Sequence, residues 1–199
     1  MSRHRRCAQL IRSSPLSLIA AALLLVACPP APTYTVGGTV TGLAGTGLVL
    51  QNNGGDDLPV TSDGAFTFAT PIASGSSYSV TVKTQPTTPS QTCVVANATG
   101  TMASNDITNV AVTCTTNTYS VGGTVSGLTG SGLVLQNNGG GDLPVSSNGA
   151  FTFAAPMTSG SSYSVAVKTQ PASPSQTCVV ANASALTKND PPLLTRTGP

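Results

Sequence analysis

A duplicated stretch of sequence constrains this chain more than any other feature. Residues 34–98 recur as residues 119–183 at a constant offset of 85 positions, and 52 of the 65 aligned positions are identical. At most of the 13 positions that differ, the two copies carry similar side chains, such as Thr35 in the first and Ser120 in the second. A repeat of this length indicates two consecutive copies of one folding unit.

The composition of each copy favours short strands joined by turns. Only 7% of the 199 residues are charged, Glu is absent, and the chain has 21 glycines and 15 prolines. Glu and Lys normally fill the exposed faces of helices, whereas Gly, Pro, Asn and Ser form turns. Apolar and polar residues alternate over 78–83, which predicts a strand with Tyr78, Val80 and Val82 facing the core.

Turn signals divide each copy into about seven short strands. Asp63 and Gly64 predict a hairpin turn ahead of Phe66 and Phe68, whose rings share one face. A glycine pair at 37–38 predicts a bulge or bend in the first strand. This pattern predicts an all-β chain of tandem β-sandwiches, one over 34–118 and a second, incomplete one over 119–183.

Three segments of the copy resemble a known type of module. Residues 48–50, 63–68 and 75–82 are similar to the pattern of carboxypeptidase-regulatory-like and Cna B-type modules, which are prealbumin-like β-sandwiches common on bacterial surfaces. The resemblance implies two tandem immunoglobulin-like/prealbumin-like β-sandwich repeats. The chain has no Glu to promote the Lys–Asn crosslink of Cna B-type modules, so that crosslink is not expected.

The first 27 residues have the pattern of a secretory signal peptide. Four Arg lie within the first 12 positions, and the apolar run at 16–26 is too short to span a bilayer comfortably. The run ends in Leu-Val-Ala-Cys, which resembles the lipobox of bacterial lipoproteins. That resemblance implies cleavage before Cys28, acylation of Cys28 and, with Pro29 after it, sorting to the outer membrane. The alternative is ordinary cleavage near Ala27, which gives a secreted or periplasmic protein.

Removal of the signal peptide would leave a weakly charged chain. Four basic residues then face six Asp, a net charge of −2, so no basic patch is left for a nucleic acid. The mature chain would begin with a stiff Pro-rich spacer at 28–33. The expected contact with the membrane is therefore the lipid anchor alone.

The remaining cysteines are unequally distributed between the copies. In an exported protein Cys93 and Cys114 predict a disulfide that pins the last strand of copy one. A metal site is the competing interpretation, but no His and no further clustered Cys accompany the pair. The position equivalent to Cys114 is Pro199, so Cys178 is predicted to be an unpaired thiol.

The second copy is expected to be incomplete. Its identity with copy one ends at Ala183, and residues 184–199 are expected to form a disordered tail in place of the last strand. A sheet that lacks its last strand has an open edge to which another chain can pair. Self-association through this edge or through Cys178 is therefore a candidate property of copy two.

The mature chain offers no catalytic constellation. The single His is His4, in the signal peptide, and the many Ser and Thr residues lack an activating base. Residues 52–57 together with Asp63 could form a calcium loop, but ordinary turn chemistry explains the same residues. Copy two has Gly141 and Asn148 at two of these positions, which removes ligand charge.

These observations predict a protein that is not an enzyme and that has no cofactor or metal. The expected function is that of a lipid-anchored structural or spacer module of the cell envelope, a remnant of a longer surface protein. The alternative is an adhesion module, or a glycan- or protein-binding module, that acts through its loops. The ligand of such a module is not encoded in any motif.

Overall fold

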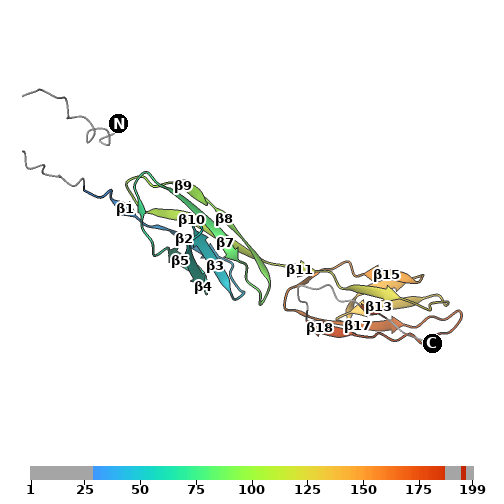
Figure 1. Cartoon of the computed structure of the whole chain (residues 1–199). Coiled ribbons are helices and arrows are strands. Elements are labelled where there is room, and N and C mark those ends of the chain that lie inside the picture. The colour runs from blue at the N-terminus through green and yellow to red at the C-terminus, as the bar shows by residue number, and fades with distance from the viewer. Residues whose placement is uncertain (1–28, 187–193, 196–199) are drawn as a thin grey trace, which may run out of the picture.

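The computed structural model describes residues 29–186 and 194–195, and these residues form strands and turns without a helix. The all-β prediction is confirmed. Figure 1 shows two groups of strands that follow one another along the chain and meet near β11. The signal peptide and Cys28 lie outside the described residues. Within the described ranges no helix is long and apolar enough to cross a membrane.

Copy one consists of two four-stranded sheets with the strand orders β5-β2-β10-β8 and β4-β3-β7-β9, together with a short β1-β6 pair. Its strands are β1 (Thr33–Tyr34), β2 (Val36–Thr41), β3 (Leu48–Asn52), β4 (Asp56–Val60), β5 (Gly64–Thr67), β6 (Ile72–Ala73), β7 (Ser77–Thr84), β8 (Gln91–Ala96), β9 (Thr99–Thr101) and β10 (Ile107–Thr116). The Pro-containing strand β4 lies at a sheet edge, where a missing N–H costs no ladder bond.

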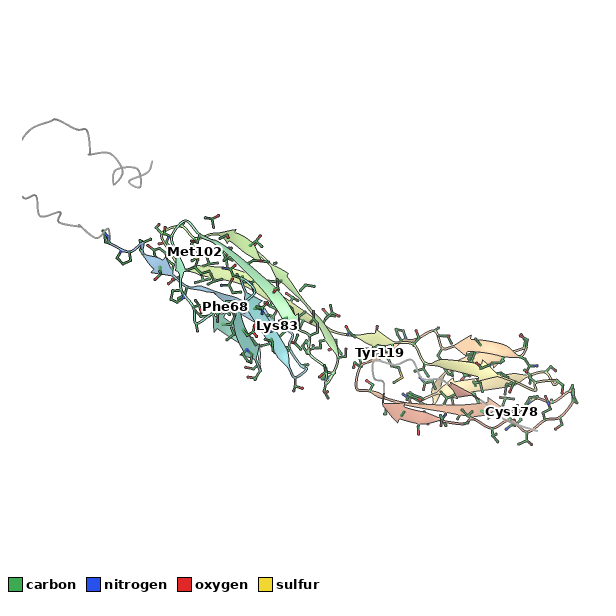
Figure 2. The ribbon with its side chains drawn as sticks, viewed as in Figure 1. Phe68, Lys83, Met102, Tyr119 and Cys178 are labelled. Carbon is green, nitrogen blue, oxygen red and sulfur yellow. A yellow bond between two sulfur atoms is a disulfide. The ribbon has the colours of Figure 1, made fainter. Side chains whose placement is uncertain are left out.

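The two sheets of copy one enclose a common apolar core. Strand periodicity places the buried side chains at alternate positions, as at Leu48 and Leu50 of β3. The rings of Phe66 and Phe68 meet edge to face with centroids 5.7 Å apart. Figure 2 marks Phe68 and Met102 in copy one, both only 1% exposed. The aromatic rings therefore serve the core rather than a binding surface.

Strand β10 is the central element of its sheet. It runs parallel to β2 and antiparallel to β8, so both of its edges are paired. Its inward side chains Val110, Val112 and Cys114 are at most 6% exposed. Burying a Val side chain contributes about 1.5–3 kcal/mol, so β10 supplies a substantial part of the stability of copy one.

The glycine pair of β2 has a different role from the predicted bulge. Strand β2 pairs without interruption with β5, and the irregularity lies instead between Ile107 and Val110 of β10. A Cβ atom added at Gly38 would lie 1.7 Å from the carbonyl oxygen of Val110. Gly38 therefore permits close approach of the parallel strand.

Copy two repeats most of this arrangement in the sheets β15-β12-β19 and β14-β13-β17-β18. Its strands are β11 (Thr118–Tyr119), β12 (Gly122–Val125), β13 (Leu133–Asn137), β14 (Gly140–Val145), β15 (Gly149–Thr152), β16 (Met157–Thr158), β17 (Ser162–Thr169), β18 (Ser184–Leu186) and β19 (Leu194–Thr195). The segment 176–180, which corresponds to most of β8, belongs to no strand.

The expectation of a disordered tail from residue 184 is wrong for part of the tail. Ser184–Leu186 pairs with β17 in the same register in which β9 pairs with β7, although the sequence identity has ended. Backbone hydrogen bonds carry this pairing, so it tolerates the change of side chains. Residues 187–193 and 196–199 lie outside the described residues.

Strand β19 pairs with β12 at positions equivalent to those where β10 pairs with β2 in copy one. It runs parallel to β12, with Leu194 opposite Gly123 and Thr195 opposite Thr124. In copy one, Val110 lies opposite the glycine equivalent to Gly123. The predicted open edge is therefore shortened by two residues of pairing.

The close approach at Gly38 predicts a large effect of a single methyl group. Gly38→Ala should lower the free energy of unfolding by about 3 kcal/mol, because the new Cβ meets backbone atoms that have no room to move. Urea denaturation measures this change. Gly55→Ala is the matched control, since nothing lies within 4 Å of its Cβ position, and it should change stability by less than about 0.5 kcal/mol. Equal effects of the two variants would contradict the close-approach interpretation.

Candidate functional site

The carboxylates of the segment considered as a calcium loop do not converge. Asp56 accepts a hydrogen bond from the backbone N–H of Thr70 at 2.9 Å, and Asp63 accepts from the N–H groups of Gly42 and Leu43 at 3.0 and 2.7 Å. Each carboxylate thus holds a different loop of the fold. Within the described part of the chain, no group of three or more His, Cys, Asp or Glu side chains is placed to hold a metal ion.

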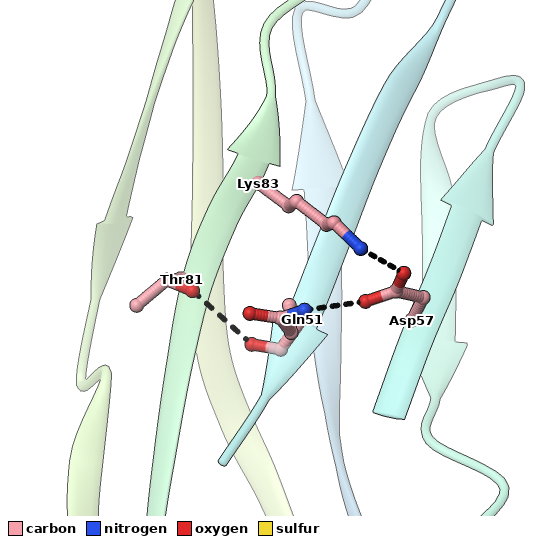
Figure 3. A network of polar contacts seen from close by, with 4 residues as sticks. All are labelled: Gln51, Asp57, Thr81 and Lys83. Carbon is pink, nitrogen blue, oxygen red and sulfur yellow. Dashed lines mark hydrogen bonds and ion pairs between the residues drawn. The ribbon is translucent and has the colours of Figure 1, made fainter. Parts of the chain in front are cut away.

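Asp57, the third carboxylate, belongs to an exposed polar network on the β4-β3-β7 surface (Figure 3). It forms an ion pair with Lys83 and accepts a hydrogen bond from the Gln51 amide at 2.6 Å, while Thr81 donates to the Gln51 carbonyl at 3.5 Å. The hydrogen bond from Lys83, followed by that from Gln51, lowers the pKa of Asp57. Copy two repeats the ion pair between Lys168 and Asp142. Exposed pairs of this kind contribute little to stability.

The cysteines that the sequence paired are placed opposite each other. Cys93 of β8 and Cys114 of β10 are register partners, with their sulfur atoms 2.00 Å apart. Cys178 of copy two is a free cysteine, and its side chain is only 4% exposed. Figure 2 labels Cys178 within copy two. Of the two equivalent cysteines, Cys93 therefore forms a disulfide in copy one and Cys178 is a free thiol in copy two.

A group of hydrogen bonds lies at the junction between the copies. Strand β10 ends at Thr116 and β11 begins at Thr118, so Asn117 alone links the copies. Its N–H donates to the Ser90 carbonyl at 3.0 Å, and its carbonyl accepts from the Ser159 N–H at 2.8 Å. Its side-chain amide donates to Ser90 Oγ and accepts from the Thr92 hydroxyl, both at 2.8 Å. All the polar groups of Asn117 are therefore engaged, on both sides of the junction.

A direct contact between the copies reinforces this linker. The Ser90 N–H donates to Ser159 Oγ at 2.9 Å, and Tyr119, labelled in Figure 2 between the two copies, donates from its hydroxyl to Ser90 Oγ at 3.3 Å. Ser90 is 8% exposed and Ser159 is 9% exposed. The residue equivalent to Ser90 in copy two is Ser175, which is exposed. Because Ser90 is buried and the equivalent Ser175 is exposed, the burial of Ser90 is due to its contact with copy two.

A buried glutamine holds the loop that presents Ser90, and the sequence analysis missed it. Gln91 is 2% exposed and accepts from the N–H groups of Ala44 and Gly45, while its amide donates to the Gly42 carbonyl at 2.8 Å. Gln176 repeats these contacts in copy two. Residues 85–91 and 170–176 differ at only two positions, so the repeat did not single out this glutamine.

Comparison with known proteins adds no family assignment. No family model matches the chain, and no curated protein matches it in sequence. The function must therefore be inferred from the geometry. That geometry offers a fixed mechanical joint at Asn117 and, at the described residues, no arrangement of an acid, a base and a nucleophile.

The connections of Asn117 predict a rigid joint. In the unmodified chain the two copies should tumble as one elongated body, which ¹⁵N relaxation of the backbone amides measures. Asn117→Gly removes both side-chain hydrogen bonds and adds backbone freedom, so the copies should then show separate rotational diffusion.

Asn105→Gly, in an exposed loop of copy one, is the matched control and should leave the common tumbling unchanged. Independent tumbling of the copies in the unmodified chain would contradict the rigid joint.

Proposed function

We propose that this chain is a non-catalytic spacer of the bacterial cell envelope, attached to the outer membrane by a lipid on Cys28. The observation that carries the proposal is the junction, where Asn117 is hydrogen-bonded to Ser90 and Thr92 on one side and to Ser159 on the other. A flexible linker would give the copies no defined separation. A one-residue joint with every polar group engaged suits a part that maintains distance.

The path of the chain supports the same function. Figure 1 shows the chain entering copy one at the end that lies away from copy two and leaving it at the junction. Each copy therefore adds its length to the molecule. With a lipid anchor at Cys28, copy one would stand next to the membrane and copy two would stand farther out.

The surface of the described residues supports a spacer over a glycan-binding module. Sugar sites usually present an exposed aromatic ring, but the described aromatic side chains are buried or partly buried, and Phe66, Phe68 and Tyr78 are at most 8% exposed. The exposed large apolar side chains of this part are Val94 and Val179, which are equivalent positions in the two copies. Their aliphatic side chains provide no stacking platform.

Membrane fractionation combined with intact mass tests the anchor. The protein should be found in the outer-membrane fraction, with a mass that corresponds to a chain starting at Cys28 and carrying acyl groups. On reduction the mass should rise by two hydrogens, for the pair Cys93 and Cys114.

Cys28→Ala serves as the control, because it removes the acylation site without changing the apolar run before it. This variant should leave the membrane fraction. A mature chain that starts elsewhere and carries no acyl group would overturn the anchored spacer and would leave a secreted or periplasmic protein.

A further inference from the structure

In copy one an aspartate side chain ties the β3–β4 turn to the segment that follows β5. Asp56, the first residue of β4, accepts a hydrogen bond from the Thr70 N–H at 2.9 Å. Asn52, at the end of β3, is only 3% exposed. The turn and the segment 68–72 are therefore held together by a carboxylate on a backbone N–H group.

Copy two has the same backbone segments without this carboxylate. The residue equivalent to Asp56 is Gly141, and the residue equivalent to Thr70 is Ala155. A Cβ atom added at Gly141 would meet no atom within 4 Å, so the space beside this position is open. Among the described residues, the exposed Ala155 has no hydrogen-bond partner for its N–H.

A groove of about 360 Å³ lies at this place in copy two. A single water needs only about 10–15 Å³ of such volume, so the groove has room for a side chain. Asn137, the counterpart of the buried Asn52, is partly exposed here. The lining includes both positions of the copy-one contact together with apolar side chains: Gly141, Ala155, Leu143, Phe153 and Met157.

A side-chain amide provides a second hydrogen-bond donor in this groove. Nδ2 of Asn137 donates to the sulfur of Met157 at 3.3 Å, and a thioether sulfur is a weak acceptor. Oδ1 of Asn137 accepts from the Ser164 N–H at 3.2 Å, which fixes the orientation of the amide. The groove is therefore lined by two donors, Asn137 and Ala155, that lack a strong acceptor.

The acidic side chain of the lining, Asp142, is already compensated. Its carboxylate forms an ion pair with Lys168 and accepts a hydrogen bond from the Gln136 amide at 3.1 Å. The positive charge of Lys168 offsets that of Asp142. A second carboxylate can therefore enter the groove without facing an unpaired negative charge.

The groove lies apart from the place that β10 and the segment before it occupy in copy one. There β10 pairs with β2 and β8, and the connection from β9 to β10 is hydrogen-bonded to Thr35 and to residues 74–76. The groove lies instead at the β13–β14 turn, in the other sheet. Its counterpart in copy one is bridged by the side chain of Asp56.

We propose that this groove of copy two binds an aspartate side chain of a partner protein. The carboxylate accepts hydrogen bonds from the Ala155 N–H and from the Asn137 amide, as the Asp56 carboxylate accepts from Thr70 in copy one. Hydrogen bonds to an ionised acceptor are stronger than those to a neutral one, so the site favours a carboxylate over an amide. This inference goes beyond the spacer function and does not depend on the lipid anchor.

Two blocked tripeptides test the site on the full mature chain by NMR. Acetyl-Ala-Asp-Ala-amide carries a single carboxylate, and acetyl-Ala-Asn-Ala-amide is its uncharged match. The aspartate peptide should shift the Ala155 amide resonance saturably, with a dissociation constant of about 10 mM for two hydrogen bonds and a small contact. The asparagine peptide should bind ~10-fold more weakly. The Thr70 resonance should stay in place, because Asp56 already accepts from its N–H.

Two glycine variants separate filling of the groove from disturbance of the turn. Gly141→Asp restores the residue of copy one and should abolish the response of Ala155 to the aspartate peptide. Gly139→Asp is the matched control, because it adds the same charge to the same turn, also at a positive φ, but at a position outside the groove lining. This variant should keep the response.

Equal shifts with the two peptides would overturn the preference for a carboxylate, and equal loss of binding in the two variants would assign that loss to the turn and overturn the site. Absence of a saturable shift at Ala155 would also overturn it. Butyrate tests the source of the carboxylate. If butyrate binds as tightly as the aspartate peptide, the groove takes small free acids and the partner protein is overturned.

Discussion

The pairing of β10 with β2 and β8 is the constraint on which the rest of the structure depends. This strand closes the core of copy one with Val110 and Val112, and it places Cys114 opposite Cys93. Its parallel approach to β2 requires a residue without a Cβ at Gly38. The two copies share most of their sequence, but the described part of β19 pairs with β12 at two positions, whereas β10 pairs with β2 at five.

The same strand also sets the geometry between the copies. β10 is paired with β2 on one side and with β8 on the other, and it ends at Thr116. The linker residue Asn117 follows directly, so its position is set by a strand that is held on both sides. The residue equivalent to Asn117 at the start of copy one is Pro32, whose ring nitrogen has no N–H to donate. Replacement of that proline by asparagine supplies the hydrogen bonds to Ser90 and Thr92, whereas the bond from the Ser159 N–H has a counterpart at Pro32, which accepts from the Ser74 N–H. The joint between the copies therefore depends on one strand and one linker residue.

Sequence patterns predicted the parts of this fold that depend on local chemistry. Alternation over 78–83 identified β7, and the Asp63–Gly64 turn identified the hairpin before Phe66. Patterns did not predict the parallel partnership of β2 and β10, which joins residues about 70 positions apart, so the role of Gly38 was missed. The buried Gln91 and the joint at Asn117 were missed for the same reason, because their partners are distant in sequence.

Native-state hydrogen exchange tests most directly whether β10 accounts for the difference between the copies. The segments 36–40 and 121–125 have the same sequence, Val-Gly-Gly-Thr-Val, so their amides have the same intrinsic chemistry. Exchange of a protected amide reports the free energy of opening its strand. The account predicts that the amides of β2, paired with β10, exchange much more slowly than their counterparts in β12. Equal protection in the two segments would contradict it.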